Sequence, residues 1–212
     1  MLKINFKDYL SSSRRQNTWG QLYGVSGERK SLTKIGVNGY DYGFFGLTAG
    51  SDYLSEIGTV GVAISVIKGK ADSKGSVAKT EFDSFVLTGY FSNKLNLGNK
   101  IATKLSLSTN SVNSKRHLRF GSIDRTASAS YNTYALDLSM DYSIKPLALS
   151  KGNLITTFKS GITYNHQESF TETGASSLNL HVASSNSKIA RFGIDQMLTL
   201  KRKEGENSLT PY

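Results

Sequence analysis

The stretch YNTYALDLSMDYSI, residues 131–144, decides the fold of this chain. Every second residue from Tyr134 to Ile144 is apolar, and the residues between them are mostly small or acidic. This period of two is typical of a β-strand with one apolar and one polar face, because a helix would spread the same apolar residues around its circumference. The stretch therefore predicts a long strand whose two faces meet different surroundings.

The same alternation recurs along most of the chain. It predicts about nine strands and the start of a tenth at 208, with uncertain boundaries: 17–25, 38–50, 56–68, 80–93, 98–109, 128–144, 153–166, 176–184 and 188–201. Many of these runs exceed the ~5–6 residues usual in soluble proteins and reach the ~9–11 residues with which a tilted strand crosses a membrane. An all-β fold, an antiparallel up-and-down transmembrane β-barrel, is the fold class that these lengths favour.

Turn-forming residues separate the runs, and the links alternate loosely between short and long, as in a barrel with short turns at one end and longer loops at the other. The longest polar interruption, at 110–127, is expected to be a loop. Aromatic residues often fall near the ends of runs: Trp19, Tyr23, Tyr40, Tyr42, Tyr90, Tyr142, Tyr164 and Phe192. Girdles at the membrane interfaces and ordinary β-propensity explain this placement equally well.

Composition narrows the function classes. The 212 residues suit one large domain, and the absence of cysteine excludes disulfides, thiol nucleophiles and cysteine-bound metals. The formal charge of +10 is spread over turns and strand ends, which fits anionic lipid head groups as a partner and argues against nucleic acid. No run approaches the ~20 apolar residues of a transmembrane helix. The first residues also lack the apolar region of a signal peptide.

Four segments carry a resemblance to a known family: WGQLYG at 19–24, GYDYGFFGLTAGSDY at 39–53, GSIDRTASASY at 121–131 and ESFTETGASSLNLHV at 168–182. Together they resemble the β-domain of bacterial autotransporters (type V secretion) over about residues 13–212, and FTETGA followed by alternating leucines is the most specific of them. The richness in lysine and asparagine looks like a rickettsial surface-antigen member of that family.

The resemblance implies a twelve-stranded barrel in the outer membrane that helps to export an N-terminal passenger to the cell surface. Its implied partners are outer-membrane lipid, the passenger polypeptide and the outer-membrane assembly machinery. Residues 1–16 are expected to be the remnant of a linker, and 17–212 a barrel domain that is incomplete at its C-terminus. GENSLTPY lacks the alternating run that serves the family as an assembly signal. A fragment with reduced or no activity is therefore expected.

Two other functions stay open at this point. One is a porin-like or structural outer-membrane β-barrel, and the other is a soluble β-barrel that binds an apolar ligand, with the apolar residues inside. Alternation alone cannot decide which face of a strand lies inside.

The predicted lumen face carries six charged candidates for pore-lining residues: Lys104, Asp137, Asp141, Lys159, Arg191 and Asp195. They would keep a channel hydrated and hold a linker, or they would simply solubilise one face of the sheet. His117, His166 and His181 lack metal-ligand spacing, and His166 near Glu168 is weak geometry for a catalytic base. We therefore expect no enzyme activity, no cofactor and no metal.

Overall fold

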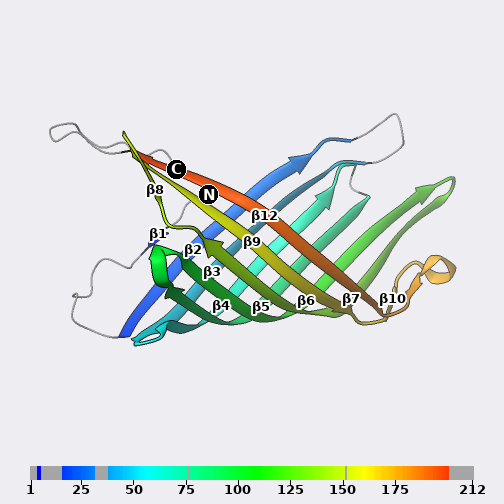
Figure 1. Cartoon of the computed structure of the whole chain (residues 1–212). Helices are drawn as coiled ribbons and strands as arrows, with labels where there is room; N and C mark the ends of the chain where they lie inside the picture. Colours follow the sequence, from blue (N-terminus) through cyan, green and yellow to red (C-terminus); the bar gives the residue numbers. More distant parts are fainter. Residues whose placement is uncertain (1–3, 6–15, 32–37, 76, 151, 201–212) are drawn as a thin grey trace.

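The computed structural model describes residues 4–5, 16–31, 38–75, 77–150 and 152–200. Most of these residues form one strongly curved antiparallel sheet, drawn in Figure 1. Its long strands, each paired with the next, are β2 Gln16–Arg29, β3 Tyr40–Ser55, β4 Gly58–Ser73, β5 Ala78–Lys94, β6 Lys100–Phe120, β7 Ile123–Ser143, β9 Gly152–Gln167 and β12 Ser185–Leu200. The predicted up-and-down arrangement of long antiparallel strands is confirmed.

Shorter elements lie at the margins of this sheet. β1 Ile4–Asn5 pairs with β2, and β8 Leu147–Leu149 pairs with β9. β10 Phe170–Thr171 and β11 His181–Val182 pair with each other. Two short 3₁₀ helices, η2 Asn96–Gly98 and η3 Ser176–Leu178, lie in links between strands. No helix among the described residues is long and apolar enough to cross a membrane.

Two of the predicted elements are wrong. Residues 110–127 are not a loop, because β6 and β7 continue through them as one hairpin that turns at 121–122. The predicted strand at 176–184 is not a strand of the main sheet: it contains η3 and the two residues of β11, which pair only with β10. The start of a tenth strand at 208 lies outside the described residues.

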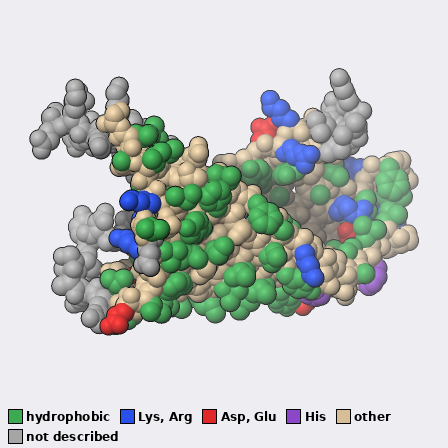
Figure 2. Space-filling view, viewed as in Figure 1, with side chains coloured by type: hydrophobic (Ala, Val, Ile, Leu, Met, Phe, Trp, Pro, Cys, Tyr) green, Lys and Arg blue, Asp and Glu red, His purple; other side chains and the backbone are tan. Residues whose placement is uncertain are grey.

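The curvature of the sheet distinguishes its two faces. On β4, Val62 and Ile64 have relative exposures of 59% and 51%, whereas Ala63 between them has 5%. Side chains on the concave face crowd together and lose exposure, so Ala63 faces inward and its apolar neighbours face outward. Figure 2 shows apolar side chains gathered over the surface of the sheet that faces the viewer. The structure thus puts the apolar face on the convex side.

Rows of directly paired residues show how complete this apolar face is. One row crosses five strands as Ile64, Leu87, Leu107, Leu136 and Tyr164. Along β7 the apolar residues run from Tyr134 to Tyr142, about 26 Å at ~3.3 Å per residue. With a tilt of about 40°, this belt is about 20 Å thick, close to the ~25 Å apolar band of a transmembrane barrel.

The interior of the described sheet holds almost no apolar core. Its buried apolar residues are Ala63, Val112, Ala127, Ala129 and Ala175, and no large side chain is fully buried. A soluble domain would bury its leucines, isoleucines and phenylalanines. Here these residues are exposed on the convex face, so the fold requires an apolar solvent around it.

The two ends of the sheet differ. At one end of the sheet lie the strand termini Ser55 and Gly58, Lys94 and Lys100, and Ser143 and Gly152; at the other, which we call the loop end, lie Arg29 and Tyr40, Ser73 and Ala78, Phe120 and Ile123, and Gln167 and Ser185. Within the described residues, the sheet order begins at β1 and β2 and finishes at β12, and these two margins do not pair with each other.

Candidate functional site

The concave face is the candidate site, because it is the polar wall of whatever the sheet encloses. Alternation and strand register place all six predicted pore-lining residues on it. Lys104 lies opposite Ser139, Asp141 opposite both Ala102 and Lys159, and Arg191 opposite Gly161. Most of the remaining wall is made of Ser, Thr, Asn, Gly and Ala. Such a wall presents hydroxyl and amide groups to water and leaves space beside them.

Asp137 and Arg191 form an ion pair across β9. Thr163 lies between them: its hydroxyl donates to Asp137 Oδ2 at 2.6 Å and accepts from Arg191 Nη1 at 2.6 Å. Gly161 makes room for the guanidinium, because a Cβ there would lie 3.3 Å from Arg191 Nη2. The carboxylate is the better shielded partner, with 21% of its side chain exposed against 51% for Arg191.

Lys159 and Asp195 form a second ion pair, between β9 and β12. Asp141 lies directly opposite Lys159 on β7, so this lysine has a carboxylate on each side. Lys104 lies on the same face but forms no ion pair with any residue that the structure describes. The structure therefore brings five of the six candidates into two adjacent charged clusters on β7, β9 and β12.

Breaking the Asp137 to Arg191 pair should cost more stability than breaking the Lys159 to Asp195 pair. A double-mutant cycle with Asp137→Asn and Arg191→Gln should give a coupling energy of about 1 kcal/mol, because this pair is shielded and joined through a hydroxyl. The matched cycle on Lys159 and Asp195 should give a smaller coupling energy, since both groups are largely in water. Urea unfolding of the chain in lipid vesicles measures both. Equal coupling energies would contradict this ranking.

A third cluster on the concave face was not predicted as a site. Trp19 Nε1 donates to the Tyr90 hydroxyl at 2.9 Å, and that hydroxyl donates to Asp52 Oδ2 at 3.1 Å. Asn17 Nδ2 donates to Asp52 Oδ1 at 3.2 Å, and Asp52 is 6% exposed. The network joins β2, β3 and β5 across the wall, so it fixes the curvature of this half of the sheet.

Glycines make the close approach of these aromatic rings possible. A Cβ on Gly61 would lie 2.1 Å from Tyr90 Cζ, and a Cβ on Gly50 would lie 2.6 Å from Trp19 Cζ2. The same arrangement holds Tyr23 over Gly46. Each ring thus lies flat against the backbone of the neighbouring strand, which keeps the wall thin where large side chains point inward.

This geometry corrects part of the expected aromatic girdle. Tyr142, Tyr164 and Phe192 lie on the convex face, where a girdle would be. Trp19, Tyr23, Tyr40, Tyr42 and Tyr90 lie on the concave face, so they cannot contact lipid from the outer surface. For all of these except Tyr40, a glycine directly opposite in register was the signal in the sequence. That signal is readable only once the pairing of the strands is known.

Comparison with known proteins identifies the family. The family described as "Autotransporter beta-domain" matches residues 18–212, which is nearly the whole chain. The chain belongs to this family. As an autotransporter β-domain it is an outer-membrane β-barrel protein with a translocator role, in a family that is not catalytic. No curated protein and no solved structure matches the chain.

The described residues offer no cluster of three His, Asp or Glu side chains that could hold a metal ion. His166 Nδ1 contacts Asn186 Oδ1 at 2.8 Å, and the nearby Glu168 accepts from Asn132 and from the Tyr134 hydroxyl. Histidine and glutamate therefore bond to separate partners, in a place where the sequence suggested a weak candidate for acid–base chemistry.

Proposed function

We propose that this autotransporter β-domain helps to carry an N-terminal passenger polypeptide across the outer membrane to the cell surface. The observation that supports this most is the opposite polarity of the two faces. The convex face is an apolar belt, and the concave face carries mostly small, polar and charged side chains. An unfolded polypeptide exposes backbone groups that need water or polar side chains along its path. The concave wall supplies both.

We propose the six charged residues as pore-lining groups. The opposite charges of Asp137 and Arg191, and of Lys159 and Asp195, keep the wall hydrated without giving it a single strong sign. A wall of mixed sign does not select strongly for passenger charge. This matches a translocator better than it matches a channel selective for anions or cations.

Domain limits and partners follow as further parts of the proposal. Residues 17–212 are the barrel domain, and the residues before them link it to the passenger. Among the described residues the sheet ends at β2 with its short partner β1 and at β12; we expect both margins to be paired in the membrane, because unpaired backbone groups facing lipid cost several kcal/mol each. Outer-membrane lipid and the outer-membrane assembly machinery are the remaining partners. The concave face acts by binding and hydration, without enzyme chemistry.

Surface display tests the proposal. The chain is placed behind an export signal and a small unfolded reporter passenger, and intact cells are treated with a protease that cannot enter them. We expect the reporter to be digested from outside in cells that make the fusion, and to stay protected when the chain is replaced by an unrelated periplasmic protein. A reporter that stays protected although the chain is inserted in the outer membrane would overturn the translocator role and favour a porin-like or structural barrel.

A further inference from the structure

The link between β9 and β12, residues 168–184, is the longest link between sheet strands in the described part of the chain, and we call it the strap. It contains β10, η3 and β11 and lies at the loop end. Figure 1 shows it beside the ends of β7, β9 and β12. Its contacts with the β6–β7 hairpin are specific enough to assign it a role.

The strap first takes the place that β9 leaves vacant beside β7. Pairing of β7 with β9 ends at Thr133 and Gln167, although β7 extends ten residues further, to Ile123. Beyond this point, Glu168 N donates to Asn132 O at 3.1 Å. Ser128 and Thr173 exchange two backbone hydrogen bonds of 2.8 and 2.9 Å. The strap thereby covers an edge of β7 that would otherwise be unpaired.

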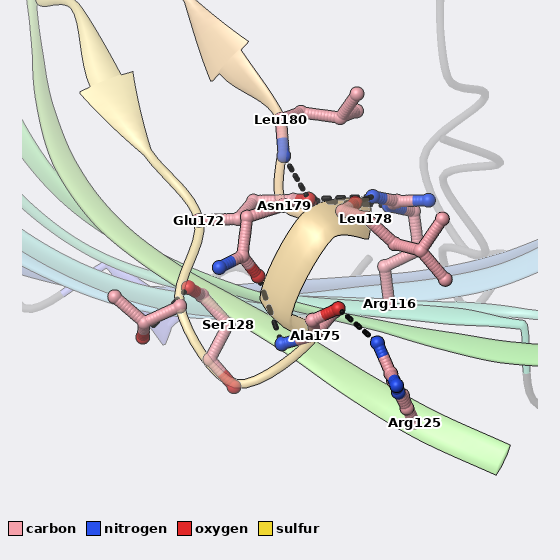
Figure 3. A network of polar contacts seen from close by, with 9 residues as sticks. Arg116, Arg125, Ser128, Glu172, Ala175, Leu178, Asn179 and Leu180 are labelled. Atoms are coloured by element: carbon pink, nitrogen blue, oxygen red, sulfur yellow. Dashed lines mark hydrogen bonds and ion pairs between the residues drawn. The ribbon is translucent and has the colours of Figure 1, made fainter.

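The strap then crosses the concave face. Glu172 precedes Thr173, so its side chain points to the same side as Ala127 and reaches Arg116, the residue paired with Ala127 on β6. Arg116 Nε donates to Glu172 Oε1 at 3.1 Å and Arg116 Nη2 to Oε2 at 2.5 Å, as a two-point ion pair (Figure 3). Only 8% of the Glu172 side chain is exposed. The ion pair spans β7 above Ala127, whose small side chain leaves room for it.

Further bonds fix the geometry around this pair. Leu180 N donates to Glu172 Oε2 at 2.9 Å, and Arg116 Nη2 also donates to Leu178 O at 3.2 Å. Arg125 Nη1 donates to Ala175 O at 3.0 Å. Gly174 has φ +94°, and a Cβ there would lie 2.6 Å from Thr126 O, so the turn needs glycine to lie this close to β7. Phe170 stacks on Tyr131 with ring centroids 4.2 Å apart.

Polar contacts outnumber apolar ones between the strap and the wall. The residues that the strap buries are Glu172 and Ala175, while Leu180 stays 50% exposed. Apart from one aromatic stack, the strap is held by hydrogen bonds and by a single shielded ion pair. Removing one partner of such a pair leaves an uncompensated shielded charge, so the ion pair is the side-chain contact whose loss should weaken docking most.

We propose that the strap is a movable cover of the concave face at the loop end, and that the Arg116 to Glu172 pair is its fastening. Docked, it occupies lumen space beside β6 and β7; released, it leaves that space to a passing polypeptide. Release of the strap for a passing polypeptide rests on the proposed translocator function. Docking of the strap and its fastening by the Arg116 to Glu172 pair do not.

Acid should release the strap. The bonds from Arg116 and from Leu180 N hold the pKa of Glu172 below its ordinary value. The stabilisation is therefore complete above the ordinary glutamate pKa and is lost as the pH falls through the lowered pKa of Glu172. Further charged or titratable groups within the strap or in contact with it are Arg125 on β7, which donates to Ala175 O, His181, which bonds to Thr171, and Tyr131 on β7, which stacks on Phe170.

Hydrogen exchange at the Thr173 amide, corrected for the intrinsic pH dependence of exchange, measures this release. Protection should vanish on acidification in the wild-type chain. Glu172→Gln should show low protection at every pH, because its amide cannot form the ion pair. Wild-type protection that persists unchanged down to the lowest pH at which the sheet itself stays folded would contradict the carboxylate as the fastening.

Cross-linking tests the docked state directly. The chain has no cysteine, so the double variant Ser128→Cys/Thr173→Cys carries one unambiguous pair. These residues form a hydrogen-bonded antiparallel pair, whose Cα atoms lie about 5.5 Å apart, within reach of a disulfide. In the full chain refolded into vesicles, mild oxidation should form this disulfide rapidly. Absence of the cross-link would overturn the docked strap.

The fastening is tested in the same background. Adding Glu172→Gln should slow cross-linking by about tenfold, because the docked fraction falls when a bond between charged groups is lost. Asp124→Asn is the matched control: it breaks the exposed Arg119 to Asp124 pair on the same hairpin and should leave the rate unchanged. Equal rates with and without Glu172→Gln would overturn the assignment of this pair as the fastening.

Export of the reporter passenger tests whether the strap acts as a gate. With the reporter passenger attached, the cysteine pair should reduce surface exposure of the reporter in oxidising medium, and a reducing agent should restore it. Equal exposure in both media would overturn the strap as a gate and leave the translocator function standing. If the cysteine-free chain exposes no reporter at all, the translocator function fails, while the cross-linking result still decides whether the strap is fastened by Glu172.

Discussion

Leu107→Arg should prevent stable insertion of the chain into a bilayer or lower its unfolding free energy by about 2–4 kcal/mol, the cost of an arginine facing lipid near the bilayer centre. Leu107 lies on the convex face in the row that joins Ile64, Leu87, Leu136 and Tyr164. No acidic side chain occurs in that row. An arginine there would have to extend toward the interface or draw water into the apolar belt.

Ser108→Arg is the matched control, one residue along the same strand. Ser108 lies on the concave face, between Val86 and Ala135, where a long charged side chain can extend into water. Urea titration of both variants in lipid vesicles should show a large loss for Leu107→Arg and a small change for Ser108→Arg. The opposite order would mean that the apolar face is not the lipid-facing one.

Gly61→Ala should lower the unfolding free energy by about 1–3 kcal/mol, the usual cost of forcing extra atoms into a packed site. The new Cβ would overlap the Tyr90 ring, which would have to leave its place against β4. Tyr90 would then lose its hydrogen bonds to Trp19 and Asp52. The large effect comes from the network across the wall, not from the added methyl group itself.

Gly89→Ala provides the control, because Gly89 precedes Tyr90 and a Cβ there meets nothing within 4 Å. Its stability should stay the same or rise by about 0.4–1 kcal/mol, since alanine restricts the unfolded chain. Trp19 fluorescence gives a second readout: its emission should change in Gly61→Ala and not in Gly89→Ala. Equal effects at the two glycines would contradict the role of the ring over Gly61.

Strand periodicity predicted most of the wall because lipid and lumen impose different demands on alternate residues. Where one face of a strand meets lipid and the other faces the lumen, as from Tyr134 to Met140, the alternation of apolar and polar residues is unambiguous. Which face lies inside depends on the sense of curvature of the whole sheet, and no local pattern encodes that. The low exposure of Ala63 between Val62 and Ile64 decided it.

The two wrongly predicted segments lie where the two faces of the chain do not separately meet lipid and lumen. In the outer part of the β6–β7 hairpin, 110–127, polar residues occur on both faces, so the strand looks like a loop in the sequence. The strap shows the opposite error. Leu178, Leu180 and Val182 alternate as a strand would, but Gly174 and the contacts of Glu172 fold this segment onto β7. Its partner Arg116 is 56 residues away in sequence, and only the strand register brings the two together.

Lipid quenching of tryptophan tests the central claim, that the convex face meets lipid and the concave face does not. Trp19 is the only tryptophan, and it lies on the concave face at the level between the rows of Leu107 and Leu105, near the middle of the apolar belt. The comparison is Leu138→Trp in a Trp19→Phe background, which puts a single tryptophan at similar depth on the convex face. In vesicles with brominated acyl chains, we predict strong quenching at position 138 and little at Trp19. Equal quenching, or stronger quenching of Trp19, would contradict the account.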